Sequence, residues 1–171
     1  MTCPYPQLIK LAKKYLDRKL LNLKINMVPN ITTMIAINKN IKSPISSMRF
    51  NDEVLAWAAN ENSKKRFKST KSLWTLQSTS KWAKRKIKLY KNDSKIEKTL
   101  ISKFNEFTGL AEAKINFKKT HGWRYSHNQS ASKFKSYWDK KRRMGICGDW
   151  LVGPKVESAW LSAFDLFKKI K

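Results

Sequence analysis

The sequence has little cysteine, few acidic residues and no long apolar stretch. Its two cysteines, Cys3 and Cys147, lie far apart and form neither a metal-binding spacing nor a disulfide pattern, which predicts a reducing, cytoplasmic setting. No run of roughly 18 apolar residues is present to cross a membrane. The first residues lack the charged-then-apolar order of a signal peptide. These absences argue against a membrane protein and against a secreted disulfide scaffold.

Acidic residues are scarce beside basic ones: 12 Asp and Glu against 37 Lys and Arg, a net charge of +25 at pH 7. Such a charge attracts phosphate backbones, so a small basic nucleic-acid-binding protein is one hypothesis. However, 30 of the 37 basic residues are Lys, whereas phosphate and base recognition usually relies on Arg. The lysines are spread over nearly every segment, and no nucleic-acid-binding motif accompanies them. The sequence favours a solvated basic surface over a nucleic-acid interface.

What the chain does contain is enough apolar material for a core. Hydrophobic residues make up 41% of the 171 residues, and seven of the aromatics are Trp. Apolar spacing predicts one α+β domain over residues 1–171, with a mostly antiparallel sheet and flanking helices. The expected helices cover 6–23, 80–90 (capped by Ser80), 94–109 (a Ser94/Glu97 capping box and a Gly109 cap) and 154–169. The expected strands cover 24–28 and 31–37 (joined through Pro29 and Asn30), 47–50 and 54–60 (a hairpin), 72–78, 113–119, 121–126 and 144–147, with loops at 61–70 and 127–141.

The sharpest candidate site follows the last predicted strand. Glycine at 148 allows a ligand to approach the backbone closely, and the Asp149 carboxylate can accept hydrogen bonds from sugar or ribityl hydroxyls. Pro154 is predicted to open the final helix, which leaves the N–H groups of Lys155, Val156 and Glu157 free for an electron-rich group. The alternative is an ordinary strand–turn–helix in which Asp149 is only a helix cap.

Five segments in order resemble the renalase-like FAD-dependent oxidoreductases, which are related to the flavin amine oxidases. Residues 147–162 (CGDWLVGPKVESAWLS) resemble the carboxy-terminal FAD-binding motif of that family. Residues 4–7 (PYPQ) resemble the segment before a helix, and 49–52 (RFND) with 55–60 (LAWAAN) and 63–64 resemble the central hairpin. Residues 74–82 (WTLQSTSKW) and 121–125 (HGWRY) resemble a strand-to-helix segment and a later strand.

The resemblance implies a substrate-binding sheet followed by an FAD-contacting segment at 142–171. Asp149 would hold the ribityl or pyrophosphate part of FAD, and residues 155–157 would face the flavin ring. Trp57, Trp123 and Tyr125 would lie near the open face of the flavin, although each is equally explained as aromatic core of a sheet. A small-molecule substrate and a nicotinamide nucleotide are the implied reaction partners. His121 is either structural or an acid–base group.

The chain lacks the part of the family that binds the FAD pyrophosphate. None of its five glycines forms a Gly-x-Gly-x-x-Gly turn, and Lys65-Arg66 replaces the Pro-Gly usual in the central loop. The resemblance therefore covers only the carboxy-terminal half. We expect either a half-enzyme that works with a separately encoded FAD-binding half, or a truncated remnant or binding module without redox activity.

Overall fold

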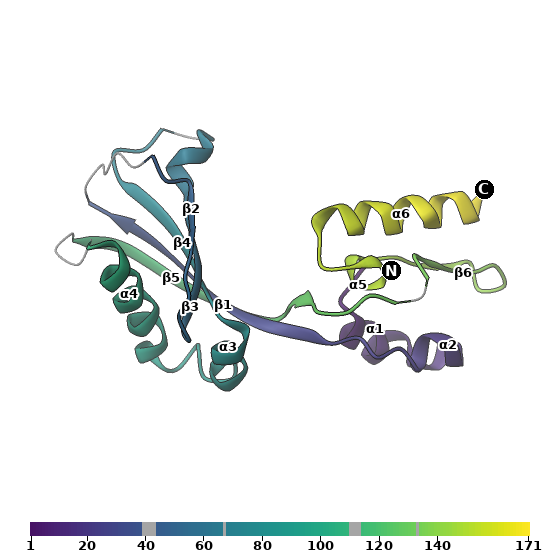
Figure 1. Cartoon of the computed structure of the whole chain (residues 1–171). Helices are drawn as coiled ribbons and strands as arrows, with labels where there is room; N and C mark the ends of the chain where they lie inside the picture. The colour runs from purple at the N-terminus through teal and green to yellow at the C-terminus, as the bar shows by residue number, and fades with distance from the viewer. Residues whose placement is uncertain (39–43, 67, 110–113, 133) are drawn as a thin grey trace. The chain divides into compact units, whose positions relative to one another are not determined.

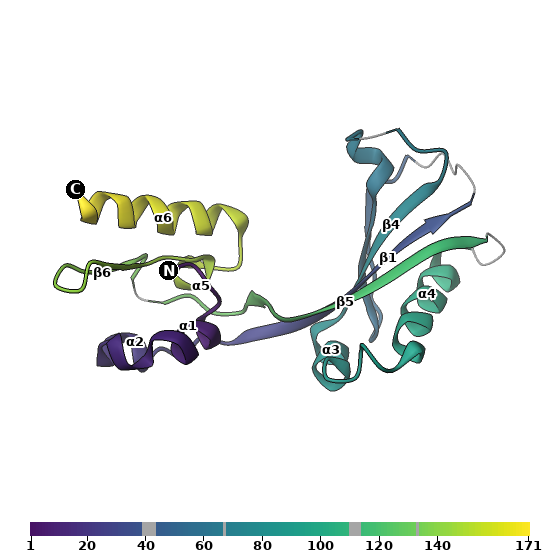
Figure 2. The same cartoon turned by 180° about the vertical axis from the view of Figure 1, so that it is seen from behind.

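The structure is a computed structural model that describes residues 1–38, 44–66, 68–109, 114–132 and 134–171. It confirms the α+β class, with a five-stranded sheet, a two-stranded sheet and flanking helices (Figures 1 and 2). The chain divides into two compact units, one formed by residues 1–28 and 125–171 and the other by residues 29–124. The expectation of a single domain stays a prediction, because grouping by contacts does not test whether the units fold independently.

The unit of residues 29–124 is built on the five-stranded sheet. Its strand order is β2-β3-β4-β1-β5, and the pairs β1/β4, β2/β3 and β3/β4 are antiparallel. The strands are β1 (Met27–Ile37), β2 (Ser47–Arg49), β3 (Leu55–Asn60), β4 (Ser72–Ser78) and β5 (Ile115–Asn128), so the boundary between the units falls within β1 and β5. The predicted hairpin at 47–60 and the strand at 72–78 are confirmed.

Two helices cover one face of this sheet, α3 (Ser80–Lys86) and α4 (Ser94–Thr108). Burial alternates along β4, and its inward residues Trp74 and Leu76 pack with Trp82 of α3 and Phe104 of α4. The Trp74 and Phe104 rings lie 5.1 Å apart between centroids. This alternation with a period of two is the sequence signal that located the strand. The core of the unit therefore lies between the sheet and its two helices.

Two predicted strand breaks are wrong. Residues 24–28 and 31–37 were expected as separate strands, but β1 runs through Pro29, which lies outside the β1–β4 ladder that begins at Thr32 and so requires no N–H there. The expected break near residue 120 is also absent from β5. Gly122 occurs within that strand because a Cβ there would lie 2.6 Å from the Tyr90 ring. The expected start at residue 113 lies outside the described residues.

The helix caps in this unit lie one residue before their predicted positions. Thr79, not Ser80, caps α3 by accepting from the Trp82 N–H, and Asp93, not Ser94, caps α4. Glu97 closes no capping box; its carboxylate accepts from the Thr120 hydroxyl and pairs with Lys118. The helix α3 also ends at Lys86, before the predicted residue 90. Gly109 is confirmed as a left-handed cap, with φ of 66°.

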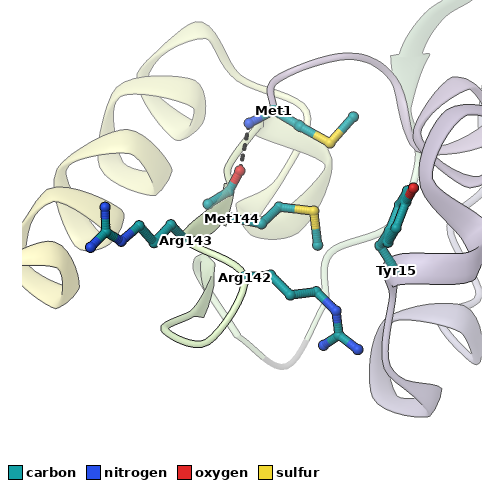
Figure 3. Close-up of a pocket in the computed structure, with 6 residues that line it drawn as sticks. Met1, Tyr15, Arg142, Arg143 and Met144 are labelled. Atoms are coloured by element: carbon teal, nitrogen blue, oxygen red, sulfur yellow. Dashed lines mark hydrogen bonds between the residues drawn. The ribbon is translucent and has the colours of Figure 1, made fainter.

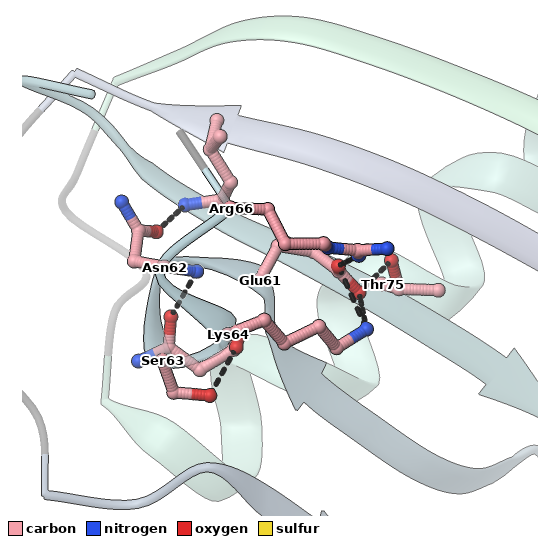
Figure 4. A network of polar contacts seen from close by, with 8 residues as sticks. Glu61, Asn62, Ser63, Lys64, Arg66 and Thr75 are labelled. Atoms are coloured by element: carbon pink, nitrogen blue, oxygen red, sulfur yellow. Dashed lines mark hydrogen bonds and ion pairs between the residues drawn. The ribbon is translucent and has the colours of Figure 1, made fainter. Parts of the chain in front are cut away.

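A polar network closes the β3–β4 connection, which contains a short 3₁₀ helix, η2 (Glu61–Lys64), where only a loop was predicted (Figure 4). The Glu61 carboxylate accepts from Lys64, Arg66 and the Thr75 hydroxyl, each at 2.8 Å. Lys65 takes the left-handed conformation, with φ of 52°, in the place where the resembled family has Pro-Gly. Lys65 thus forms a left-handed turn and Arg66 an ion pair with Glu61, so the structure accommodates both residues that depart from Pro-Gly.

The unit of residues 1–28 and 125–171 has three layers. Figure 1 shows the hairpin of β6 (Tyr137–Asp139) and β7 (Met144–Ile146) with α6 (Val156–Ile170) on one side and the amino-terminal helices on the other. Those helices are α1 (Tyr5–Ala12), η1 (Lys13–Tyr15) and α2 (Arg18–Leu21), and a further short helix is α5 (Asp149–Val152). The buried core joins α1, α2, β7 and α5 through Leu8, Leu20, Ile146 and Trp150, among others.

Two further predictions in this unit are corrected. The single helix expected over 6–23 is interrupted, because Asp17 starts α2 as its N-cap and accepts from the Leu20 N–H at 3.0 Å. The region 127–141, expected as a loop, contains β6, which pairs with β7 from Tyr137 opposite Ile146 to Asp139 opposite Met144. In the described residues no helix has the length and apolar character needed to span a membrane.

Candidate functional site

The candidate site is the β7–α5–α6 segment at the carboxy-terminal end of the chain. The strand β7 ends at Ile146, buried Cys147 follows, and Gly148 is the N-cap of the short helix α5. Gly153 then ends α5, and α6 begins two residues after Pro154. The order strand, Gly-Asp, turn, helix is as predicted, with α5 inserted where only a turn was expected.

Gly148 is held by a buried serine that sequence reasoning had left without a role. Its N–H donates to the Ser162 hydroxyl at 2.9 Å, and that hydroxyl donates to the carbonyl of Lys135 at 2.6 Å. Ser162 is fully buried on α6, so it ties the Gly148 turn and the residue 135 backbone to that helix. The only sequence signal for it was a serine at a helix position that faces inward, four residues after buried Ser158.

The lack of a side chain at 148 serves the packing of Trp150. A Cβ built on Gly148 would lie 2.6 Å from Trp150 Nε1 and 3.0 Å from its Cδ1. The Trp150 indole is almost fully buried, stacks at a tilt on Tyr5 with centroids 5.2 Å apart, and donates to the Cys3 carbonyl at 3.2 Å. The group that lies close to the Gly148 backbone is therefore the Trp150 indole of the same chain.

Asp149 presents a carboxylate that nothing else in the described part of the chain uses. Asp149 is half-buried and is the first residue of α5, and its backbone carbonyl accepts from the Gly153 N–H at 2.7 Å. The side chain makes no cap hydrogen bond and no ion pair with the described residues. The alternative in which Asp149 acts as a helix cap is thus wrong. A half-buried carboxylate without a partner is suited to accept hydrogen bonds from a hydroxylated ligand.

The amino-terminus of α6 differs in detail from the prediction. The helix begins at Val156, not Pro154, with Lys155 as its N-cap. The Lys155 N–H is not free, because it donates to the Gly153 carbonyl at 2.9 Å, so that predicted contact is corrected. The N–H groups of Val156 and Glu157 occupy the first turn of a 15-residue helix, where the helix dipole favours electron-rich groups.

The three predicted substrate-side aromatics occupy separate positions. Trp57 lies half-buried on β3 opposite Gln77 and Arg49, whereas Trp123 lies on β5 with 52% of its surface exposed. The strands β4 and β1 separate β3 from β5, which places these two strands about 14 Å apart across the sheet. Tyr125 falls in the other unit and is half-buried. None of the three belongs to either buried core cluster.

His121 has aromatic neighbours and no acid–base partner within the described residues. Its ring is exposed and meets Trp123 edge-on at 4.4 Å and Tyr90 at 6.1 Å between centroids. Tyr137 lies beside Asp17; burial first, and then this carboxylate, raises its pKa to about 12. A phenol with that pKa stays protonated at neutral pH.

A pocket of about 630 Å³ lies at the start of β7 (Figure 3). It is lined by Met1, Tyr15, Arg142, Arg143, Met144 and Gly145. Arg142 is engaged by Asp139 at 2.7 Å, and the amino-terminal ammonium donates to the Gly145 carbonyl. Sequence reasoning did not identify this pocket. It lies at the other end of β7 from Gly148, about 10 Å along the strand.

The described residues contain no group of three or more His, Cys, Asp or Glu side chains placed to hold a metal ion. The segment offers the Asp149 carboxylate as an acceptor and the backbone N–H groups of Val156 and Glu157 as donors. These groups suit an organic ligand with hydroxyls and carbonyls.

A scan against known protein families finds none that matches this chain. Several solved structures share its fold, among them the following two. One is a protein of Exiguobacterium sp. 255-15 assigned as a protoporphyrinogen oxidase, with a TM-score of 0.67 and 10% sequence identity. The other is a protein of Pyrococcus furiosus, with a TM-score of 0.53 and 10% identity. Each match covers 99% of this chain but only 40% and 39% of the neighbour, so the chain spans about two-fifths of their length.

Proposed function

We propose that this chain is the substrate-side and carboxy-terminal part of an FAD-dependent oxidoreductase, and that it binds FAD only together with a separately encoded dinucleotide-binding polypeptide. The observation that carries the proposal is the fold match. It extends over 99% of this chain to a protein assigned as a protoporphyrinogen oxidase, an oxidase activity that flavin chemistry serves. A distant likeness at 10% identity supports the fold alone. The argument for flavin chemistry comes from the residues of the candidate site.

The residues of the segment are compatible with the hydroxylated and electron-rich parts of FAD. The Asp149 carboxylate is half-buried and has no partner among the described residues, so it would accept from ribityl hydroxyls. The N–H groups of Val156 and Glu157 would donate to the pyrimidine side of the flavin from the start of α6. Bound flavin supplies hydride transfer, while the protein positions it and excludes water.

A second polypeptide would supply the binding site for the FAD pyrophosphate. A strand, a Gly-x-Gly-x-x-Gly turn and a helix normally hold the pyrophosphate, and the sequence contains no such turn. Asp149 and two amides would supply only one side of the cofactor. The small-molecule substrate and a nicotinamide nucleotide as redox partner remain part of the same proposal.

The test is FAD binding with and without the second polypeptide. We expect no retention of flavin by the purified chain alone, and quenched flavin fluorescence in a complex with a polypeptide that carries the Gly-x-Gly-x-x-Gly turn. Asp149→Ala should then weaken FAD binding roughly 10- to 100-fold, because a charged hydrogen-bond acceptor is lost. Circular dichroism of the variant should match the parent.

Glu157→Ala is the matched control, because it removes a nearby carboxylate but keeps the backbone N–H that the proposal uses. FAD affinity should change little in this variant. If no FAD binds in either arrangement, the chain is a remnant or a binding module without flavin, and the proposed function is wrong.

A further inference from the structure

The outward face of α6 is apolar, which is unusual for a helix in the outermost layer of its unit. The exposed fractions are 93% for Val156, 63% for Trp160, 42% for Phe164, 51% for Phe167 and 53% for Ile170. Four of these residues, Val156, Trp160, Phe164 and Phe167, follow one another at intervals of three or four and form one side of the helix, which we call the α6 stripe.

The inward face of the same helix combines two serines with a leucine. Its buried residues are Ser158, Ser162 and Leu166, and Leu166 lies against Gly145 of β7, where a Cβ would come within 2.9 Å. An outermost helix normally buries its apolar side and exposes its polar side. On α6 the largest apolar side chains are exposed while Leu166 is buried, and apolar residues on both faces are the pattern of a helix that lies between two layers.

The α6 stripe is ordered as a flat aromatic surface with a cationic border. The Trp160 and Phe164 rings stack at 5.2 Å with an interplanar angle of 8°. The ammonium groups of Lys168 and Lys171 each lie 4.5 Å from the centroids of the Phe164 and Phe167 rings. Of the two acidic residues of α6, Glu157 lies in the first turn, away from these lysines, and Asp165 is engaged by Lys169 at 2.8 Å and by the Ser136 hydroxyl. The border therefore has unneutralised positive charge.

Resting on the proposed function, we propose that the α6 stripe is the docking surface for the separate FAD-binding polypeptide. That partner would present an apolar surface bordered by carboxylates. In these two solved neighbours the part that matches this chain makes up 40% and 39% of the polypeptide, so most of each neighbour lies outside the matching part. A layer supplied by that remainder would cover the stripe.

Charge disfavours a second copy of the chain as the occupant. Each copy carries +25, so bringing two α6 stripes together would place like charges at close range. A different polypeptide with acidic residues around its apolar surface would instead be attracted by this positive charge. A bilayer with anionic headgroups also has complementary charge, and the experiment separates it from a polypeptide.

The experiment measures binding to the polypeptide that is encoded beside this chain in its own genome and carries the strand, Gly-x-Gly-x-x-Gly turn and helix. We expect a complex that retains FAD. Trp160→Glu should weaken complex formation about tenfold or more, because buried tryptophans at interfaces carry a large share of binding energy. Leu11→Glu is the matched control, since Leu11 is 67% exposed on α1 in the same unit, and affinity should stay within about twofold.

The outcomes separate the docking surface from the proposed function. A complex that retains FAD and is equally stable with Trp160→Glu overturns the docking surface and leaves the function standing. The absence of such a polypeptide, or of any complex and bound FAD with the unmodified chain, overturns the function itself. A dimer that Trp160→Glu dissociates, or binding to phosphatidylglycerol vesicles that the same variant abolishes, assigns the stripe to another occupant and overturns the proposal.

Discussion

Glu61 is a carboxylate whose surroundings keep it ionised although its side chain is only 16% exposed. Burial alone would raise its pKa, but the hydrogen bonds from Lys64, Thr75 and Arg66 outweigh burial and lower the pKa below its ordinary value of 4.5. The ionised form is thus preferred more strongly in the folded chain than in the unfolded chain.

This preference predicts a pH dependence of stability. A group with a lowered folded pKa adds stability above its unfolded pKa, near 4.5, and loses that contribution as the pH falls through the folded pKa. We expect the unfolding free energy of the parent to decrease more steeply than that of Glu61→Gln as the pH falls below about 4.5. At neutral pH the variant should be less stable by about 1 kcal/mol, because Lys64 and Arg66 lose their acceptor.

Urea unfolding at a series of pH values measures this effect. A variant with both Lys64→Met and Arg66→Met should also show a shallower profile, because the cations that lower the pKa are gone. Parallel profiles for the parent and Glu61→Gln would contradict the assignment.

At the scale of elements, the turn between β7 and α5 depends on packing that no pattern in the sequence indicated. Gly148→Ala should destabilise the chain by about 1–3 kcal/mol, because the new methyl group would overlap the buried Trp150 indole. The shift should appear as a lower midpoint in chemical denaturation. In a Trp150→Phe background, where the Nε1 atom that comes within 2.6 Å is missing, the same substitution should cost clearly less. Equal costs in both backgrounds would show that the clash is not the cause.

Elements with a strong local period were predictable from the sequence. The alternation in β4, the helical spacing of α4 with Gly109 after it, and the order of β7 and α6 all came from the residues themselves. The errors arose where tertiary contacts decide. The break predicted at residue 120 is absent because β5 continues from Ile115 to Asn128, and Pro29 reads as a break until the β1–β4 ladder is known to begin at Thr32.

The candidate site likewise has features that the sequence predicted and features that depend on tertiary contacts. The Gly-Asp pair and the start of a helix after it could be located from sequence spacing, and Asp149 stands without a partner in the described part of the chain. The role of Ser162 could not be predicted, because it requires knowing that Gly148 and Lys135 lie on the same side of α6. The engagement of the Lys155 N–H by Gly153 likewise depends on a local turn that composition does not reveal.

At the scale of the whole molecule, the net charge of +25 acts on stability as well as on partner choice. Like charges on a compact chain repel one another, and unfolding relieves this repulsion. Surface ion pairs such as Lys64–Glu61 and Lys103–Glu106 contribute in the opposite direction, but exposed pairs contribute little each. The excess of unpaired lysines should therefore dominate the response to salt.

We accordingly expect sodium chloride to stabilise the chain. The screening length falls from about 30 Å at 0.01 M to about 8 Å at 0.15 M, so repulsion between distant lysines is largely removed over that range. The Tm should rise by about 2–4 °C, which corresponds to about 1 kcal/mol for a chain of this size. Scanning calorimetry at the two salt concentrations measures the change. A variant with both Lys140→Gln and Lys141→Gln, two exposed residues, should show a smaller rise. If the Tm falls with salt instead, ion pairs outweigh repulsion in the folded chain.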